Sequence, residues 1–100
     1  MSEEKFVVGL CLLDLTIPGP GSLKEKRHVV KGLVTKIRNS FNISVAEVGN
    51  HDLWQRTSLG FCLAGNDRRF VDTCLNKMVD FVQKMHSVTI LSQEREIISY

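Results

Sequence analysis

The stretch FVVGLCLLDLTIPGPGSLKE, residues 6–25, contains a buried strand, a break and the beginning of a helix. Residues 6–17 are apolar at nearly every position, so a strand here carries apolar side chains on both of its faces. Such a strand is central in its sheet and at least partly covered on both sides. Residues 18–21, Pro-Gly-Pro-Gly, end the strand. Ser22 and Glu25 then form the S-x-x-E pattern of a capping box, which begins a helix.

Downstream of this stretch, the hydrophobic pattern alternates between helix and strand. Apolar residues at helical spacing predict an amphipathic helix over residues 22–40 and a second helix capped by Asn66 or Asp67. Three more strands are predicted, over residues 43–48, 57–64 and 88–99. The first two of these are separated by turn residues and are predicted to form a hairpin.

The order strand, helix, strand, strand, helix, strand is typical of a ferredoxin-like βαββαβ sandwich, an α+β fold. The right-handed crossover rule places both helices on one face of a four-stranded antiparallel sheet. A length of 100 residues suits a single domain spanning residues 1–100, and 43% hydrophobic with 24% charged residues is ordinary for a globular protein. Because the other sheet face is left open beneath an apolar strand, we expect a covering partner, and a homodimer through that face is the commonest solution.

The cysteines and the apolar segments indicate the cellular compartment of the protein. Cys11, Cys62 and Cys74 are odd in number, widely spaced and without a Cys-x-x-Cys pair, which favours a reducing compartment. The apolar run at residues 6–13 is shorter than the roughly 20 residues of a membrane span, and the leader at residues 1–5 is acidic. We therefore expect a cytoplasmic protein with no membrane partner.

Positive charge is concentrated in the first predicted helix, although the net charge of the chain is only +2. The cations of this segment are Lys24, Lys26, Arg27, Lys31, Lys36 and Arg38. Only Glu25 opposes them there. Lys24, Arg27, Lys31 and Arg38 are spaced to follow one side of the helix, where a row of cations can neutralise successive phosphates of RNA or DNA. The alternative is a solvated helix face, which most charged runs are. We take Lys24, Lys26, Arg27, Lys31 and Arg38 as candidate nucleic-acid-binding residues.

A second candidate contact lies between the two hairpin strands, at Trp54, Gln55 and Arg56. An exposed tryptophan beside a cation can stack on an unpaired base while its neighbours contact the backbone. The alternative, which is more usual for a single tryptophan in a small domain, is that Trp54 closes one end of the core. The sequence leaves both placements open.

The sequence gives weaker signals for metal, cofactor or phosphate-ligand sites. No motif has metal-ligand spacing, and we expect neither a metal nor a cofactor; His51 and Asp52 fit turn hydrogen bonds instead. The loop at residues 18–21 precedes a helix N-terminus, a weak anion site, so a small phosphate-ligand-binding domain or enzyme stays as an alternative without identifiable catalytic residues. Asp14 in the first strand needs a partner, for which Arg95 in the last strand is a candidate.

Five separate segments, in order, resemble the YlxP-like family of small bacterial proteins, a domain of unknown function. These segments are SLKEKR at 22–27, FN at 41–42, VAEV at 45–48, DLWQR at 52–56 and EREI at 94–97. The resemblance implies a ferredoxin-like fold in the bacterial cytoplasm, encoded beside genes for transcription termination, translation initiation and ribosome maturation. It supplies no catalytic residues.

Together, the residues and the resemblance predict a non-enzymatic binding module that contacts RNA or a ribonucleoprotein through its basic first helix. A homodimeric structural or regulatory domain, interacting through the open sheet face, is the second hypothesis.

Overall fold

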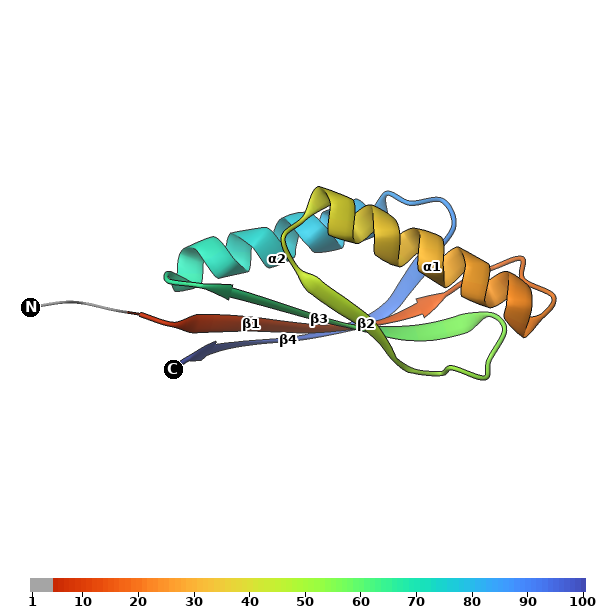
Figure 1. Cartoon of the computed structure of the whole chain (residues 1–100), viewed down its shortest axis with the longest axis horizontal. Helices are drawn as coiled ribbons and strands as arrows, with labels where there is room; N and C mark the ends of the chain where they lie inside the picture. The colour runs from red at the N-terminus through yellow and green to blue at the C-terminus, as the bar shows by residue number, and fades with distance from the viewer. Residues whose placement is uncertain (1–4) are drawn as a thin grey trace, which may run out of the picture.

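The computed structural model describes residues 5–100 and contains two helices and four strands in the predicted order (Figure 1). The elements are β1 Val7–Thr16, α1 Leu23–Ser40, β2 Ser44–Gly49, β3 Arg56–Gly65, α2 Arg68–Gln83 and β4 Thr89–Ser99.

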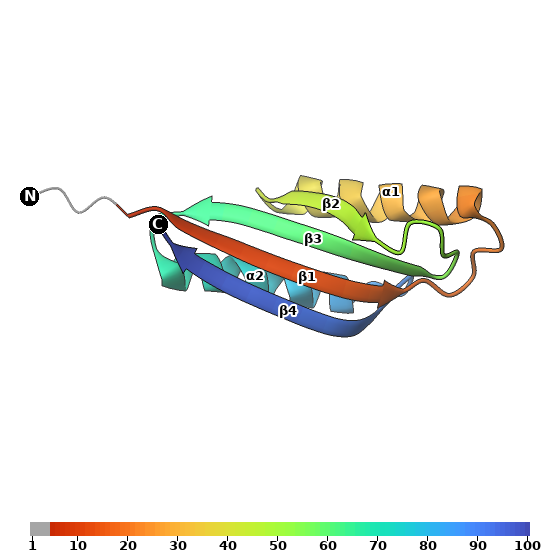
Figure 2. The same ribbon diagram turned by 90° about the horizontal axis from the view of Figure 1, so that it is seen from below.

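The four strands form one antiparallel sheet in the order β2-β3-β1-β4. Both helices lie on the same side of this sheet, and its other side faces the viewer uncovered in Figure 2. α1 packs over the edge strand β2, whereas α2 packs over β1, β3 and β4. The predicted ferredoxin-like βαββαβ sandwich, with both helices on one face, is therefore confirmed.

The central strand β1 has apolar side chains on both faces, as its sequence predicts. The side chains buried beneath the helices are Val7, Cys11, Leu13 and Leu15. The opposite, open face carries Leu10 and Leu12, whose exposed fractions are 36% and 37%. Within the described chain, the helices cover one side of β1 and the other side stays in contact with solvent.

Hydrogen bonds from side chains begin both helices. Ser22 Oγ accepts the backbone N–H of Glu25 at 3.1 Å, as a capping box requires. The carboxylate of Glu25, however, accepts the N–H of Gly21 at 2.5 Å, one residue earlier than the pattern predicts. Asp67 rather than Asn66 caps α2, accepting the N–H of Arg69 at 3.4 Å. These caps fix the residue at which each helix begins.

Gly9 lies where β1 passes closest to α2. A Cβ at this position would lie 2.5 Å from Cγ1 of Val71 and 3.1 Å from Cδ1 of Leu75. We expect Gly9→Ala to lower the free energy of unfolding by about 1–3 kcal/mol, because overpacking forces side chains or backbone to shift. Urea denaturation measures this. The matched control is Gly32→Ala in α1, where nothing lies within 4 Å and a gain of up to about 1 kcal/mol is expected. Equal stability of Gly9→Ala and the wild type would contradict the close approach.

Candidate nucleic-acid interface

Lys24, Arg27 and Lys31 are exposed on the side of α1 that faces away from the sheet. Arg38, in the last turn of the helix, is also exposed, but its Nη2 donates a hydrogen bond of 3.0 Å to the backbone carbonyl of Val45. This contact reaches the edge strand β2, so the row of cations runs along the outer border of the molecule. Lys24, Arg27 and Lys31 form no such contact with residues 5–100 and can meet an anionic partner.

Lys26 does not belong to this exposed row, so its prediction as a phosphate contact is wrong. Its exposed fraction is 0%, and its Nζ lies 2.7 Å from a carboxylate oxygen of Glu47 in β2. The same Nζ donates to the backbone carbonyls of Asn50 at 2.7 Å and His51 at 3.1 Å. Lys26 is therefore a structural residue that ties α1 to β2 and to the loop that follows it.

The burial of Lys26 follows from its angular position on the helix. Val30, Leu33 and Ile37, at four, seven and eleven residues beyond Lys26, are all buried. Those spacings return to the same side of an α-helix, so Lys26 falls within the apolar stripe. This spacing is visible in the sequence and would have separated Lys26 from the exposed cations.

Glu47 supplies the negative charge that compensates the buried ammonium group of Lys26. Burial by itself would raise the pKa of the Glu47 carboxyl, but hydrogen bonds from Lys26 and Thr57 outweigh it and hold the pKa below the usual 4.5. Thr57 Oγ1 donates to Glu47 Oε2 at 2.5 Å. The carboxylate is thus ionised at neutral pH and is hydrogen-bonded from both α1 and β3.

The loop between β2 and β3 is held in one shape by further contacts. Asn50 adopts a positive φ of 60°, and its side-chain N–H donates to Ser58 Oγ at 2.9 Å. Gln55 connects the loop to the β1–α1 segment, because its carbonyl accepts the N–H of Ile17 at 2.9 Å and its side chain donates to the carbonyl of Pro20 at 3.4 Å. The loop therefore lies at the N-terminal end of α1, as Figure 1 shows.

Trp54, within this loop, is on the surface. Its exposed fraction is 52%, and that of the adjacent Leu53 is 49%. The usual placement, in which a single tryptophan closes the core, is not adopted, and its ring is available for stacking. Arg56, at the beginning of β3, is half-buried with its Nε unpaired. The structure thus brings the loop with Trp54 and Gln55 to the same end of the molecule as the first cations of α1.

Asp14 and Arg95 do not meet, contrary to the sequence-based candidate pairing. Asp14 lies toward the open face and accepts hydrogen bonds from the hydroxyls of Ser58 and Ser92. Arg95 reaches α2 instead, where it pairs with Asp72 at 3.0 Å and donates to Asn76 at 2.7 Å. The two side chains project from opposite faces of the sheet, because Asp14 is paired with Ser92, three residues from Arg95.

The helix N-terminus at α1 is a poor anion site. The carboxylate of Glu25 already occupies the N–H of Gly21, and a negative group there repels an incoming anion. The neighbouring hollow is lined by Pro18, Gly19, Pro20, Lys24, Glu25, His28 and Val29. This geometry gives no support to the alternative of a phosphate-ligand-binding domain or enzyme.

Residues 5–100 contain no group of three or more His, Cys, Asp or Glu side chains placed to hold a metal ion. Neither α1 nor α2 is long and apolar enough to cross a membrane.

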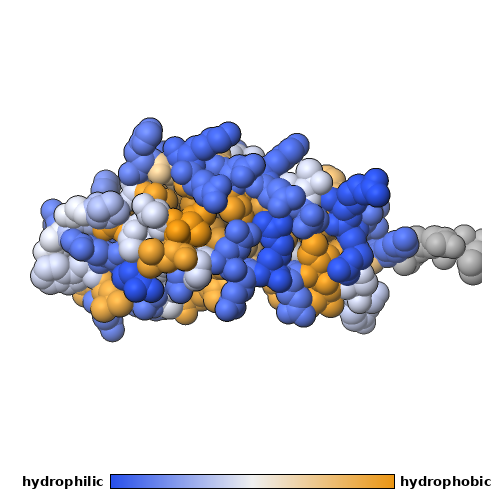
Figure 3. Space-filling view, turned by 180° about the vertical axis from the view of Figure 1, so that it is seen from behind, coloured by the Kyte–Doolittle hydropathy of each residue, from blue (hydrophilic) through white to orange (hydrophobic). Residues whose placement is uncertain are grey.

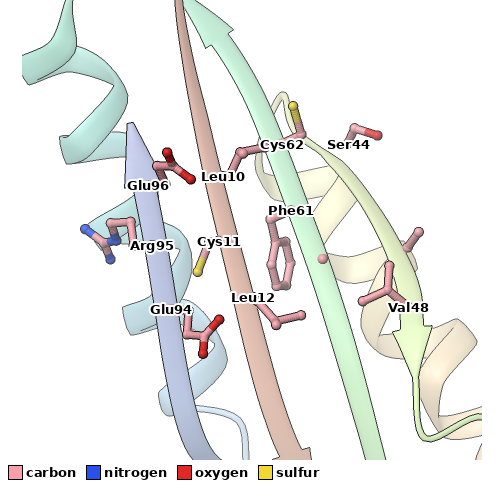
Figure 4. A pocket seen from close by; sticks show the side chains of 12 residues that line it. Leu10, Cys11, Leu12, Ser44, Val48, Phe61, Cys62, Glu94, Arg95 and Glu96 are labelled. Atoms are coloured by element: carbon pink, nitrogen blue, oxygen red, sulfur yellow. The ribbon is translucent and has the colours of Figure 1, made fainter. Parts of the chain in front are cut away.

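The open sheet face is a second candidate surface. Leu10 and Leu12 on β1 lie beside a shallow groove of about 500 Å³, which Val48 on β2 borders from the other side (Figure 4). Glu94 and Glu96 on β4 flank the leucines. By contrast, seen from the side of α2 and β4, the surface is a mosaic of hydrophobic areas separated by hydrophilic side chains (Figure 3).

The fold and these surfaces define the class: a small ferredoxin-like α+β domain with a basic outer helix, an ordered loop carrying an exposed tryptophan and an uncovered sheet face. Residues 8–95 match the family described as "Protein of unknown function (DUF503)", and the chain belongs to this family.

The similarity to one individual protein agrees with this assignment. The chain is 34% identical over 82 residues to the uncharacterized protein YlxP of Bacillus subtilis (strain 168), covering 82% of this chain and 89% of that protein. Among solved structures, the de novo designed protein Foldit4 resembles it with a TM-score of 0.51 at 10% identity, covering 95% of this chain and 96% of that one, which concerns the fold alone. A dimeric ferredoxin-like protein from an uncultured marine organism scores 0.35 at 13% identity, with 96% of each chain covered.

Proposed function

We propose that this protein is a non-enzymatic cytoplasmic module that binds RNA, or the RNA of a ribonucleoprotein such as the ribosome, through the outer side of α1 and the β2–β3 loop. The observation that carries the proposal is the exposed row Lys24, Arg27 and Lys31, none of which forms an ion pair within residues 5–100. Unpaired cations on one helix side supply the sequence-independent part of nucleic-acid affinity.

The loop adds a contact of a different kind. An ordered, half-exposed tryptophan offers a flat ring on which an unpaired base can stack, and stacking of this kind is tolerant of base identity. Lys26 supports the loop from inside by binding two of its carbonyls, so the ring of Trp54 is presented without a large ordering penalty at the moment of binding. Single-stranded or looped RNA therefore suits this surface better than a regular duplex.

Trp54 is the only tryptophan of the chain, so its fluorescence reports on this loop alone. We expect single-stranded RNA to quench its emission at low salt. We also expect Trp54→Ala to weaken binding of a dye-labelled RNA by about 1–3 kcal/mol, or roughly 5- to 150-fold, because a stacked base is lost. Fluorescence anisotropy of the labelled RNA measures the affinity.

Leu53→Ala is the matched control, because it removes a similarly exposed apolar side chain from the same loop without removing a ring. If RNA binds with unchanged tryptophan emission and Trp54→Ala retains full affinity, the loop is not part of the contact surface.

The second candidate function is that of a homodimeric structural or regulatory domain that interacts through the open sheet face. It is favoured by the exposed apolar side chains of Leu10, Leu12 and Val48 on that face, since neighbouring apolar groups on a surface commonly mark a protein interface. The two candidate surfaces lie on opposite layers of the sandwich, so pairing of the sheets leaves α1 free.

A further inference from the structure

The open face has a relief that is set by the register of its strands. On β1, Leu10 and Leu12 project as a ridge. At the same level on β3 stand Cys62 and Gly60, and beyond them on β2 stand Ser44 and Ala46. A row of large side chains therefore runs parallel to rows of small ones on β3 and on the first part of β2, and the groove lies above these small side chains (Figure 4). Val48 on β2 closes the groove at one end, because its Cγ1 lies 3.1 Å from where a Cβ at Gly60 would stand.

From this relief we infer that the groove is filled by the leucine ridge of a second copy of this chain, an inference that rests on the proposed homodimerisation. The two-fold axis would run parallel to the strands, between β1 and β3. Such an axis stacks β1 of each copy over β3 of the other, so Leu10 of one copy meets Cys62 of its partner copy. Leu12 meets Gly60 and the Val48 methyl groups that border it. Large side chains then face small ones twice, as an isologous interface requires.

The charges and the area of the open sheet face favour a second copy of this chain over other binding partners. Glu94 and Glu96 stand beside the ridge, and their carboxylates repel nucleic acid and anionic lipid surfaces. The arrangement places them over the small β2 side chains of the partner copy, at the rim of the interface, where water can reach them. Three strands of about ten residues and the shorter β2, about 4.8 Å apart, span roughly 600 Å² in plane, against the roughly 800 Å² per partner of a standard interface.

The native cysteines report whether this face is covered. Cys62 is exposed on the open face, whereas Cys74 is half-buried on α2, on the other side of the sheet. Burial raises the pKa of the Cys11 thiol above its usual value, against the opposing effect of Arg95, so Cys11 reacts slowly. Alkylation at Cys62 therefore reads the open face, with Cys74 as the internal reference.

The test combines sedimentation equilibrium with iodoacetamide labelling of the full-length protein over a range of concentrations. We expect a species of twice the 11.3 kDa chain mass, with Cys62 alkylated at least about tenfold more slowly than in the dilute monomer and Cys74 unchanged. Leu12→Lys should give a folded monomer with reactive Cys62, because its ammonium group can pair with Glu94 across the strands but is not tolerated between two sheets.

The matched control is Leu53→Lys, which makes the same change at an exposed leucine outside the sheet face and should leave the dimer intact. A dimer whose Cys62 stays reactive, or that survives Leu12→Lys, would overturn the ridge-in-groove arrangement while leaving dimerisation standing. A protein that is monomeric at all concentrations would overturn both. RNA affinity, measured separately, is affected by neither result.

Discussion

Replacing Lys26 with alanine is expected to lower the free energy of unfolding by about 3 kcal/mol. Loss of one partner of a buried ion pair typically costs about 3–5 kcal/mol, because the other charge is left without compensation. The lower end applies here, since the side chain of Glu47 keeps 18% of its surface exposed. The substitution also removes two hydrogen bonds to the β2–β3 loop. Urea denaturation followed by circular dichroism measures the change.

The pH dependence separates the ion pair from simple loss of packing. The folded-state pKa of Glu47 is lowered, so the stability that it contributes is complete above about pH 4.5 and is lost as the pH falls through the folded value. The wild type should lose this contribution on acidification, whereas Lys26→Ala has little of it to lose. The stability of the Lys26→Ala variant should therefore fall less than that of the wild type between neutral pH and the acid range.

Two further variants make this prediction falsifiable. The double variant Lys26→Met/Glu47→Gln removes both charges and should recover most of the stability, because no uncompensated charge remains. Lys36→Ala, at an exposed lysine of the same helix, should change stability by less than about 0.5 kcal/mol. A Lys26→Ala protein as stable as Lys36→Ala would show that the buried lysine does not hold these elements together.

Reversing three charges of α1, in Lys24→Glu/Arg27→Glu/Lys31→Glu, is expected to weaken RNA binding at least about 100-fold at low salt without unfolding the domain. Each cation near an anionic surface contributes roughly 1 kcal/mol, and each new carboxylate adds repulsion. The side chains are exposed, so the fold should be retained. Anisotropy of a labelled single-stranded RNA measures affinity, and circular dichroism measures folding.

The matched control for this variant is Arg69→Glu/Lys77→Glu/Lys84→Glu, which reverses three exposed cations on or beside α2. Both triple variants change the net charge from +2 to −4, because each substitution subtracts two charges. Only the α1 variant should lose binding. Equal losses in the two variants would mean that net charge, not the α1 surface, controls the interaction.

The fold could be predicted from the sequence because its signals are local. The apolar run of β1, the Pro-Gly break after it and the helical spacing of α1 each depend on neighbouring residues alone. The apolar character of both β1 faces also indicated the open surface that carries Leu10 and Leu12.

The candidate site was less predictable because it depends on contacts between distant residues. The exposure of Trp54 follows from a loop that Lys26 holds from 24 and 25 residues away. The predicted pairing of Asp14 with Arg95 is wrong because Arg95 is paired with Cys11, three residues from Asp14, so the two side chains lie on opposite faces. A strand register of this kind leaves little signal in a single sequence.

The most direct measurement of the proposed function is the affinity of the wild-type protein for a labelled single-stranded RNA between about 50 mM and about 200 mM salt. Contacts from Lys24, Arg27 and Lys31 to phosphates predict that the logarithm of the association constant falls linearly with the logarithm of salt concentration, with a slope of about −2, or 0.7 per contact on a single strand. No binding at the lowest salt, or an affinity that salt does not change, would contradict the proposal that α1 is a nucleic-acid-binding surface.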